Sequence, residues 1–372
     1  MDPVWLVLPG LCIWGIILLL PWRPWSTRES LDADPEATAD LSEITALVPA
    51  RNEARYIVDT LRSLAQQGSD HRIVLIDDES TDATVALAES LRLSNLKIIK
   101  GAPLARGWSG KLWALEQGRQ AADTKYLLLL DADIRLKPGL LPALMAKLER
   151  EDLRLISLMA FLRMETLWEK MLMPAFIYFF KLLYPFRLSN SRSRLVAAAA
   201  GGCILIDRQL LEEIGGFTAL KGELIDDCAL ARQVKNKGGA IWTGLTHSAI
   251  SQRHYDDLGS IWDMVARTAY TQLRYSTLLL LLCTILMLSA FIMPMTAFFT
   301  GITICAIFAC LIFLLMTISY LPTLKYYGVN LLWVITLPVT GLLYLLMTWS
   351  SAINHWRGIG ASWKGRAYTE GV

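Results

Sequence analysis

The sequence predicts an α/β domain with a mostly parallel sheet, joined to helices that cross a membrane. Between Leu41 and Asp257, short strand-like runs alternate with helical patterns, which is typical of a parallel sheet covered on both faces. Outside that range, long stretches carry no charged residue. Of the 372 residues 54% are hydrophobic and only 19% are charged, which is not the composition of an ordinary soluble protein.

The charge-free stretches predict four membrane spans. They are Pro3 to Trp22, Tyr275 to Leu324 and Tyr326 to Asn354. A helix needs about 20 apolar residues to cross a bilayer, so the first stretch is long enough for one span, the second for two and the third for one more. We therefore expect an N-terminal anchor at residues 1–22 and three transmembrane helices within residues 277–353. Basic residues follow the first stretch instead of preceding it, which favours a retained anchor over a secretion signal.

The flanking charges predict the side of the membrane on which the domain lies. A linker at residues 23–40 begins with basic residues, so the positive-inside rule places the domain at residues 41–257 in the cytoplasm. One anchor and three later spans would then leave the tail, residues 354–372, outside. The tail is basic, however, which favours the inside. The sequence does not decide between a re-entrant helix and an exception to the rule.

Two shorter segments are expected to lie in the membrane interface. Residues 170–187 combine apolar and aromatic side chains with flanking basic residues but are too short to span a bilayer. A buried core helix explains the same pattern equally well. Residues 258–276 connect the domain to the later spans and form the second such segment.

The domain is expected to begin with alternating strands and helices. The strands are predicted at Ile44–Pro49, Arg72–Asp77, Leu96–Lys100 and Tyr126–Asp131. The helices are predicted at Glu53–Ala65, from the capping residue Asp82 to Leu91, and at Lys111–Ala122.

The motif Asp131-Ala-Asp133 points most directly to chemistry. It follows five residues suited to a buried strand, and a strand period of two allows both carboxylates to face a common point. Two such charges repel each other unless one is protonated or a cation lies between them. A hard divalent ion with phosphate oxygens in its shell would meet this need. The alternative is a turn or helix cap, where Asp is common.

Two other predicted strands also end in carboxylates. The first runs into Pro49-Ala-Arg-Asn-Glu53, and the second into Asp77-Asp78-Glu-Ser-Thr-Asp82. Carboxylates at the carboxyl edge of a sheet can accept hydrogen bonds from ribose hydroxyls or a base N–H. Each motif alone fits an ordinary turn. Three strands that all end in carboxylates are harder to explain by turn chemistry.

Together, these motifs at this spacing resemble the inverting glycosyltransferases of family 2, whose nucleotide-sugar-binding domain has the GT-A fold. The resemblance covers the whole domain. Three further segments look most like the hopene-associated glycosyltransferases of bacteria: Trp108-Ser-Gly-Lys111, Arg267 to Tyr275, and Trp363-Lys-Gly-Arg366. The resemblance implies a multi-pass protein of the bacterial inner membrane with its catalytic domain facing the cytoplasm.

The resemblance also implies a role for each candidate site residue. Asp133 is expected to bind Mg²⁺ or Mn²⁺, with Asp131 as a second ligand or a ribose contact. Asp227 is expected to be the general base, with Asp226 as the alternative, because displacement at an anomeric carbon needs a carboxylate to remove the acceptor proton. An Asp at a helix start is also favoured by the helix dipole. The donor is expected to contact Pro49, Glu53, Asp77, Asp78, Lys111, Gly201 and Gly202.

One departure from the family pattern concerns the number of sugars transferred. Related enzymes that build long chains carry a Gln-x-x-Arg-Trp signature before the membrane helices, and no such signature occurs here. Arg267 or Arg274 could still neutralise the leaving diphosphate. We therefore expect a single transfer instead of processive polymerisation. Arg106 and Lys111 flank a loop and could face base or phosphate, or could simply be solvated.

The sequence thus predicts a membrane-bound glycosyltransferase that moves a sugar from a nucleotide-diphosphate donor, best matched by a UDP-sugar, to a lipid acceptor. A hopanoid-related acceptor is implied only by the resemblance. A nucleotidyltransferase of the same fold is one alternative, although such enzymes usually carry a Gly-rich basic loop after the first strand. A non-catalytic, nucleotide-sugar-binding membrane scaffold is another. The net charge of +2 argues against a nucleic-acid partner.

Overall fold

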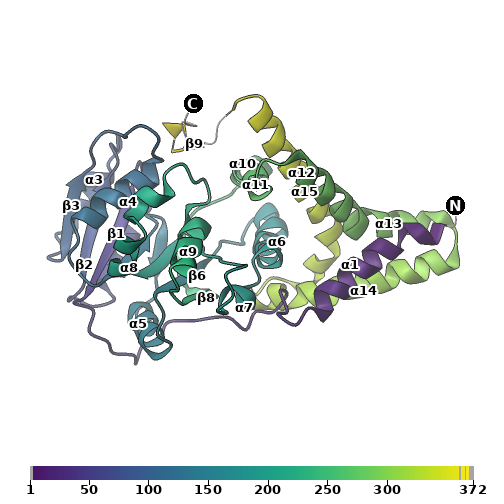
Figure 1. Ribbon diagram of the computed structural model, residues 1–372, viewed down its shortest axis with the longest axis horizontal. Helices are drawn as coiled ribbons and strands as arrows, with labels where there is room; N and C mark the ends of the chain where they lie inside the picture. The colour runs from purple at the N-terminus through teal and green to yellow at the C-terminus, as the bar shows by residue number, and fades with distance from the viewer. Residues whose placement is uncertain (1–2, 360–361, 365, 368–372) are drawn as a thin grey trace. The chain divides into compact units, whose positions relative to one another are not determined.

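The chain forms two compact units (Figure 1). The computed structural model describes residues 3–359, 362–364 and 366–367. One of the two units, which we call the α/β unit, comprises residues 29–163, 188–253 and the chain from 360 onward. The second, the helical unit, comprises residues 1–28, 164–187 and 254–359. The predicted domain at 41–257 is therefore interrupted by a segment that belongs to the helical unit.

An eight-stranded mixed sheet forms the centre of the α/β unit, with the strand order β3-β2-β1-β4-β7-β6-β8-β5. The first four strands in this order are parallel, as predicted. Strand β7 is antiparallel to β4 and β6, and β5 is antiparallel to β8, so the second half of the sheet is mixed. The strands are β1 (Ile44–Ala50), β2 (Arg72–Asp77), β3 (Leu96–Lys100), β4 (Tyr126–Leu130), β5 (Ile134–Leu136), β6 (Leu155–Phe161), β7 (Cys203–Asp207) and β8 (Ile241–Ser251).

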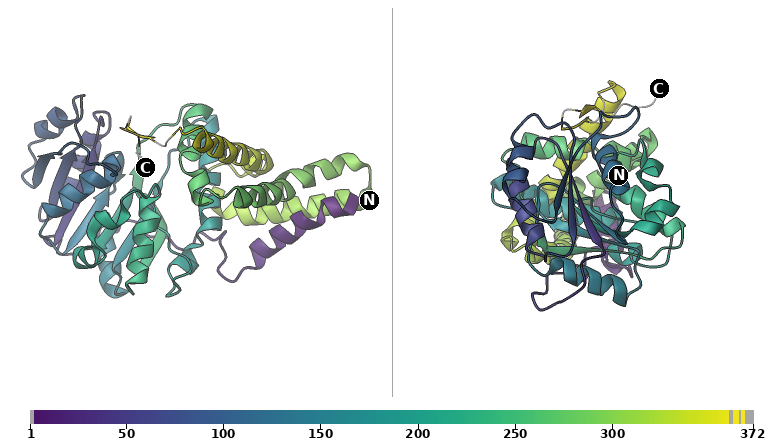
Figure 2. Two further views of the ribbon diagram at one scale, coloured as in Figure 1. Left: turned by 45° about the horizontal axis from the view of Figure 1, so that its top comes forward. Right: turned by 90° about the vertical axis from the view of Figure 1, so that its left-hand side faces the viewer.

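Helices cover both faces of this sheet, because alternate residues of the central strands pack on opposite sides (Figure 2). Ile44 and Val48 of β1 pack with the helices of one face, and Leu47 packs with those of the other. All of β1 is buried, as expected for a strand between two helical layers. The helices are α2 (Ile57–Ala65), α3 (Thr84–Ser90) and α5 (Leu140–Arg150) on one face, and α4 (Gly110–Gln120), α8 (Arg208–Glu213) and α9 (Asp226–Asn236) on the other.

The carboxyl ends of β1, β2 and β4 meet at one edge of the sheet. The Asp78 N–H donates to the Ala50 carbonyl at 2.8 Å, and the Asp131 N–H donates to the Gly202 carbonyl at 3.1 Å. The acidic motifs therefore share this carboxyl edge, as predicted. The argument from strand periodicity was wrong, however. Strand β4 ends at Leu130, and Asp131 begins a turn in which its carbonyl accepts from the Ile134 N–H at 3.0 Å.

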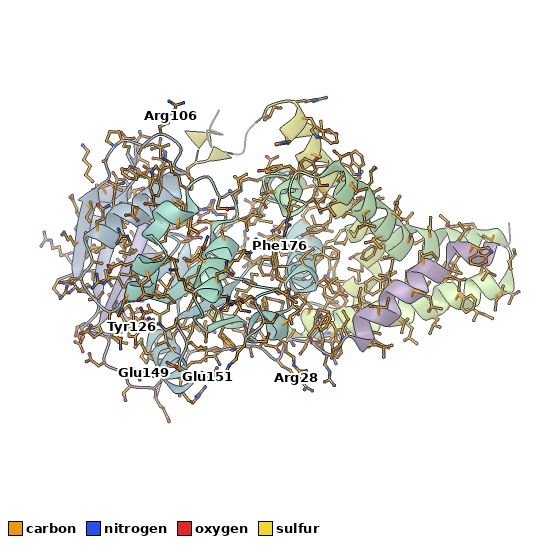
Figure 3. The ribbon with its side chains drawn as sticks, viewed as in Figure 1. Arg28, Arg106, Tyr126, Glu149, Glu151 and Phe176 are labelled. Atoms are coloured by element: carbon orange, nitrogen blue, oxygen red, sulfur yellow. The ribbon has the colours of Figure 1, made fainter. Side chains whose placement is uncertain are left out.

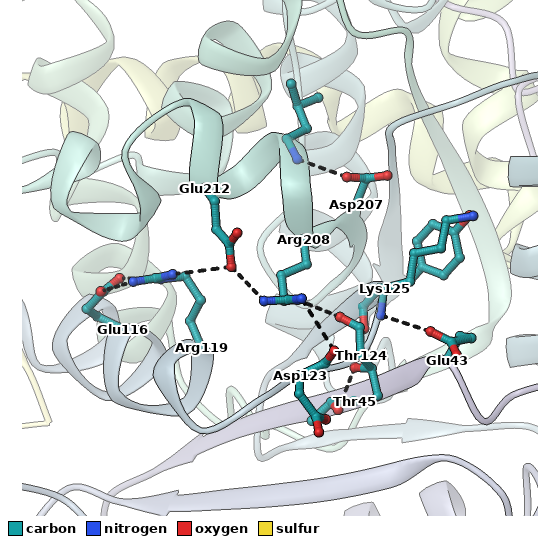
Figure 4. A network of polar contacts seen from close by, with 12 residues as sticks. Glu43, Thr45, Glu116, Arg119, Asp123, Thr124, Lys125, Asp207, Arg208 and Glu212 are labelled. Carbon is teal, nitrogen blue, oxygen red and sulfur yellow. Dashed lines mark hydrogen bonds and ion pairs between the residues drawn. The ribbon is translucent and has the colours of Figure 1, made fainter.

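The opposite, amino edge of the sheet is held by a network of paired charges (Figure 4). Arg208 donates to the Thr124 carbonyl at 2.7 Å and pairs with Glu212 at 2.7 Å. Arg119, in the last turn of α4, pairs with Glu116 at 2.7 Å and with Glu212 at 3.8 Å. This network ties α4 to α8 and to the segment before β4. Helix α4 carries the candidate residue Lys111 in its first turn, and β4 leads directly into Asp131.

The helical unit contains three helices long and apolar enough to cross a membrane: Thr277–Thr300, Thr303–Tyr326 and Leu331–Trp356. The first consists of α12 (Thr277–Met287), the π-helical turn η3 (Leu288–Ile292), α13 (Met293–Ala297) and η4 (Phe298–Thr300). The second is α14 (Thr303–Tyr326), and the third consists of η5 (Leu331–Thr336) and α15 (Leu337–Trp356). Many large apolar side chains on these helices are exposed, as membrane contact requires.

The N-terminal apolar helix is shorter than the predicted anchor. It extends from Val4 to Leu19 and consists of η1 (Pro3–Leu6) and α1 (Leu8–Leu19). It packs closely on the π-helical turn, where a Cβ at Gly10 would lie only 2.7 Å from the Ser289 carbonyl oxygen. A π-helical turn changes the carbonyl pairing of its helix. The Ala290 carbonyl accepts a hydrogen bond from the Trp14 indole at 3.0 Å.

The remaining helices connect these parts. Helix α6 (Leu167–Leu183) begins earlier than the predicted interfacial helix because Thr166 and Glu169 form a capping box. Its buried Lys181 donates to the Ser26 carbonyl at 2.9 Å. Smaller elements are α7 (Phe186–Ser189), η2 (Gly216–Leu220), α10 (Leu258–Ala266), α11 (Ala269–Gln272) and a two-stranded hairpin of β9 (Ser362–Trp363) and β10 (Arg366–Ala367).

Candidate active site

Lys111 lies at the centre of the acidic groups. Its Nζ forms an ion pair with Asp131 Oδ1 at 2.7 Å and lies 3.4 Å from the Gly201 carbonyl oxygen. The N-cap Ser109, whose hydroxyl accepts from the Leu112 N–H at 3.3 Å, fixes the first turn of α4 from which Lys111 projects. Burial alone would lower the pKa of Lys111, but the attraction of the carboxylates around it raises that pKa above its ordinary value. Lys111 is therefore a permanent cation.

Asp227, the candidate general base, lies near Lys111 at Gly201. A Cβ at Gly201 would lie 3.2 Å from Lys111 Nζ and 3.4 Å from Asp227 Oδ2. The two charged groups therefore converge over a position that has no side chain. Asp227 is in the first turn of α9, and its Oδ1 accepts from the Cys228 N–H at 2.7 Å. The structure thus brings together Lys111, Asp131, Gly201 and Asp227, which are far apart in the sequence.

The electrostatic environment of Asp227 suits proton transfer. Burial and the neighbouring Asp226 raise the pKa of Asp227 to about 7, although backbone N–H groups and Lys111 oppose this shift. A carboxyl group with a pKa near the working pH can be ionised before the reaction and still accept a proton during it. Perturbed carboxyl groups of this kind are characteristic of active sites.

Asp133 is paired with Arg253, a residue that sequence reasoning missed. Arg253 Nε donates to Asp133 Oδ2 at 2.7 Å, and its Nη2 lies 3.4 Å from Glu53 Oε1. Arg253 follows β8, whose last residue, Ser251, pairs with Ile134 just after Asp133. The available signal was a basic residue directly after a strand that ends at the carboxyl edge. The strand itself was not predicted, so the signal could not be used.

Glu53 is almost completely buried, with 5% of its surface exposed. Its Oε1 forms an ion pair at 2.7 Å with Nζ of Lys364, from the C-terminal hairpin. Within the described residues, its Oε2 has no hydrogen-bond partner. Burial raises the pKa of Glu53, although Lys364 and Arg253 act in the opposite direction. One oxygen of this buried carboxylate is therefore held by cations, and the other is buried without a hydrogen-bond partner among the described residues.

The acidic turn after β2 has a partly structural role. Asp77 Oδ1 accepts from the Ser80 N–H at 3.1 Å, and Asp82 Oδ1 accepts from the Thr84 N–H at 3.0 Å at the start of α3. Asp78, between strand and turn, is buried beside β1. Pro49 lies within β1 opposite Ile76. The turn interpretation therefore holds for Asp77 and Asp82, whereas the contact of Asp78 with a donor stays a prediction.

Several predicted residues are not brought to this cluster. Gly202 is an exception, because its carbonyl accepts from the Asp131 N–H at 3.1 Å. Arg106 is exposed, and Figure 3 shows its side chain extending outward from its loop, as expected for a solvated charge. Arg267 and Arg274 belong to the helical unit, so their contact with a donor diphosphate stays a prediction.

The carboxylates at this edge fit a hard divalent cation. No cluster of three or more Asp, Glu, His or Cys side chains stands ready for a metal ion in the part of the chain that the structure describes. Asp133 nevertheless suits a cation, because its buried carboxylate already pairs with the cationic side chain of Arg253. A divalent ion bound through one or two carboxylates plus substrate phosphates needs no larger protein cluster.

Comparison with known proteins identifies the fold of the α/β unit. A mannosyltransferase from Pyrobaculum calidifontis, solved with GDP-Man and Mn²⁺, superposes with a TM-score of 0.59 at 18% identity, covering 95% of this chain and 98% of that one. The α/β unit has the GT-A fold, as predicted. Residues 45–215 match the family described as Glycosyl transferase family 2. The matched range therefore resembles a family 2 glycosyltransferase domain.

Curated relatives share part of this domain. The 4,4'-diaponeurosporenoate glycosyltransferase of Staphylococcus haemolyticus is 26% identical over 125 residues, which are 33% of this chain and 32% of that protein. The protein of the same name from Staphylococcus aureus (strain MRSA252) is 33% identical over 91 residues, 24% of each chain. The matched part thus spans about a third or less of these relatives. The closer resemblance to hopene-associated enzymes stays a prediction.

Proposed function

We propose that this protein is a membrane-associated, inverting glycosyltransferase that transfers one sugar from a nucleotide-diphosphate sugar to a lipid hydroxyl. The observation that carries the proposal is the convergence of Asp131, Lys111 and Asp227 around Gly201 at the carboxyl edge of the sheet. This arrangement joins a carboxylate of the donor motif to a second carboxylate, that of Asp227, whose pKa is raised to about 7. Inversion at an anomeric carbon needs a base of this kind.

The donor would bind along the carboxyl edge. Glu53 and Asp78 would face the nucleoside, and Lys111 would lie next to the transferred sugar or its phosphates. Asp133 would hold Mg²⁺ or Mn²⁺, with Asp131 beside it, once Arg253 releases its carboxylate. The bound ion would offset negative charge on the departing diphosphate. A UDP-sugar is the first donor to test.

The base step is a single displacement. Asp227 takes the proton of the acceptor hydroxyl while that oxygen forms a bond to the anomeric carbon. The bond between the anomeric carbon and the diphosphate oxygen breaks, and the nucleoside diphosphate leaves with the electron pair. The pKa of Asp227 places enough of it in the ionised form near pH 7 to accept this proton.

A lipid acceptor is supported by the helical unit and by the relatives. Three helices of the unit are apolar enough to enter a bilayer, which would bring the site to a membrane-dissolved acceptor. The curated relatives are named 4,4'-diaponeurosporenoate glycosyltransferases. We propose a polyprenoid-type lipid, with a hopanoid as the first candidate, and a cytoplasmic α/β unit in a bacterial inner membrane.

The experiment is a transfer assay on membranes that contain the full-length protein. Membranes are incubated with a panel of labelled UDP- and GDP-sugars, with and without Mg²⁺ or Mn²⁺, and the lipid is extracted. We expect label in the lipid fraction for at least one donor, only when the metal is present, and none for Asp133→Asn. Label that stays water-soluble with every donor would refute the lipid acceptor.

A binding measurement tests the metal site without turnover. Mn²⁺ binding, followed by the electron paramagnetic resonance signal of the free ion, should be weakened in Asp133→Asn. Asp207→Asn, at the amino edge, is the matched control and should bind Mn²⁺ like the wild type. Equal Mn²⁺ binding by Asp133→Asn and the wild type would remove Asp133 from the metal site.

A further inference from the structure

The C-terminal hairpin belongs to the α/β unit, although it follows α15 of the helical unit in the sequence. Strands β9 and β10 pair in antiparallel fashion, and Lys364 lies between them with a left-handed backbone φ of 50°. This segment contains the Trp363-Lys-Gly-Arg366 motif, to which the proposed reaction assigns no role. Its position therefore needs a separate explanation.

Lys364 is held at the acidic edge by both its backbone and its side chain. Its Nζ pairs with Glu53 Oε1 at 2.7 Å, and its carbonyl oxygen accepts from Arg51 Nε at 3.3 Å. The same Arg51 guanidinium donates through Nη1 to the Asp78 carbonyl at 2.5 Å and to the Glu79 carbonyl at 3.1 Å. Arg51 therefore ties the hairpin to the turns that follow β1 and β2. These two turns carry the carboxylates expected to face the nucleoside.

The pairing of Glu53 is one-sided. Lys364 and Arg253 both contact Oε1, whereas Oε2 is buried and has no hydrogen-bond partner in the described part of the chain. A buried oxygen without a partner costs free energy. A ligand with an N–H or O–H group directed at Oε2 would recover that cost. Nucleoside bases and ribose carry such groups.

We propose that the C-terminal hairpin completes the nucleoside half of the donor site and that Lys364 is a positioning residue, which orients Glu53 so that Oε2 faces the nucleoside. The inference rests on the proposed function, because it takes the ligand to be a nucleoside diphosphate. Lys364 contacts the carboxylate and not the nucleoside. Its cation keeps Glu53 charged and fixes the rotamer of its carboxylate before the ligand arrives, which lowers the entropic cost of binding.

The experiment measures the binding of UDP, GDP and uridine to the full-length protein in detergent, with Mg²⁺ present, by isothermal titration calorimetry. Lys364→Met should weaken the binding of the preferred diphosphate by about tenfold or more, because hydrogen bonds to charged groups contribute on that scale. Lys364→Arg, which keeps the charge, should restore most of the affinity. Lys237→Met removes an exposed lysine of the same unit and should bind like the wild type.

Two further comparisons separate the positioning role from a direct contact. Uridine or guanosine should lose affinity by the same factor as its diphosphate, since Lys364 acts on the nucleoside half. In the Glu53→Gln background, Lys364→Met should cause little further loss, because residues that act through one another are not additive. An undiminished loss in that background, or a loss confined to the diphosphates, would refute the positioning role.

The outcomes distinguish this inference from the proposed function. If the wild type binds neither UDP nor GDP, the donor class proposed above is wrong. If the wild type binds one of them and Lys364→Met binds it equally well, only the role of Lys364 is wrong. Tighter binding by Lys364→Met would show that the hairpin competes with the donor, which also overturns the inference.

Discussion

The two edges of the sheet hold their charged groups in opposite ways. At the amino edge, Arg208 and Arg119 pair with Glu116 and Glu212, and the network ties helices to strands (Figure 4). At the carboxyl edge, Glu53 and Asp133 are buried, and five acidic side chains share three cations. The acidic groups there are Glu53, Asp131, Asp133, Asp226 and Asp227, and the paired cations are Lys111, Arg253 and Lys364.

This difference indicates that the carboxyl edge of the sheet is the edge suited to binding a ligand. A network whose charges match stabilises the fold by itself. A buried acidic cluster with fewer cations is costly until another cation or hydrogen-bond donor arrives. Local conflicts of this kind are expected at functional sites. Substitutions at the carboxyl edge should therefore affect turnover, and substitutions at the amino edge should affect stability.

The largest effect is expected at Asp227. Asp227→Asn should lower kcat by about 10²- to 10⁴-fold, the range that general base catalysis contributes, and should leave donor binding unchanged. The measurement is lipid glycosylation under saturating donor, together with calorimetry of donor binding. Asp226→Asn is the matched control and should retain more activity. A normal transfer rate in Asp227→Asn would refute the assignment of the base.

The pH dependence of turnover follows from the same carboxyl group. Because the pKa of Asp227 is raised to about 7, the base is increasingly protonated below that pH, and kcat should fall as the pH drops from 8 to 6. The sign for stability is opposite. A carboxyl group with a raised folded-state pKa costs stability as the pH rises from its unfolded value of about 4 towards 7.

A melting series checks this stability effect. Asp227→Asn carries no charge at either pH, so its Tm relative to that of the wild type should be higher at pH 8 than at pH 5. An equal difference in Tm at both pH values would mean that Asp227 does not titrate with a raised pKa.

An intermediate effect is expected at Lys111. Lys111→Met leaves Asp131, Asp226 and Asp227 without their shared cation, so kcat should fall by about 10- to 100-fold, the scale of a charged hydrogen bond. Lys111→Arg should recover part of this loss. Arg106→Met removes an exposed cation from the preceding loop and should be neutral. A loss in donor affinity alone, with normal kcat, would instead make Lys111 a simple phosphate contact.

The smallest effect on turnover is expected at the amino edge. Arg208→Met removes the hydrogen bond to the Thr124 carbonyl and the pair with Glu212. The free energy of unfolding should fall by about 1–2 kcal/mol. Thermal unfolding and a transfer assay measure the two quantities separately. A lower kcat for Arg208→Met, measured well below its Tm, would contradict the expectation that the amino edge affects stability and not turnover.

The sequence allowed prediction of the elements that local pattern determines. Strands β1, β2, β3 and β4 were located within a residue or so, because each is a short apolar run bounded by turn residues. Their shared carboxyl edge followed from parallel pairing. Of the cations at that edge, Lys111 was predicted, whereas Arg253 and Lys364 were not, because they are remote in the chain from the carboxylates that they contact. Arg253 is 120 residues from Asp133, and Lys364 follows the apolar helices of the other unit.

The contact between Lys364 and Glu53 also limits how the chain can cross a bilayer. Both residues belong to the α/β unit, which the chain leaves after Arg253 and re-enters at residue 360. A path that starts and ends on one side of a membrane crosses it an even number of times. We infer that the three apolar helices between these points cannot all cross, so at least one turns back or lies along the surface. The described basic residues Lys364 and Arg366 then lie on the same side of the membrane as the rest of the α/β unit.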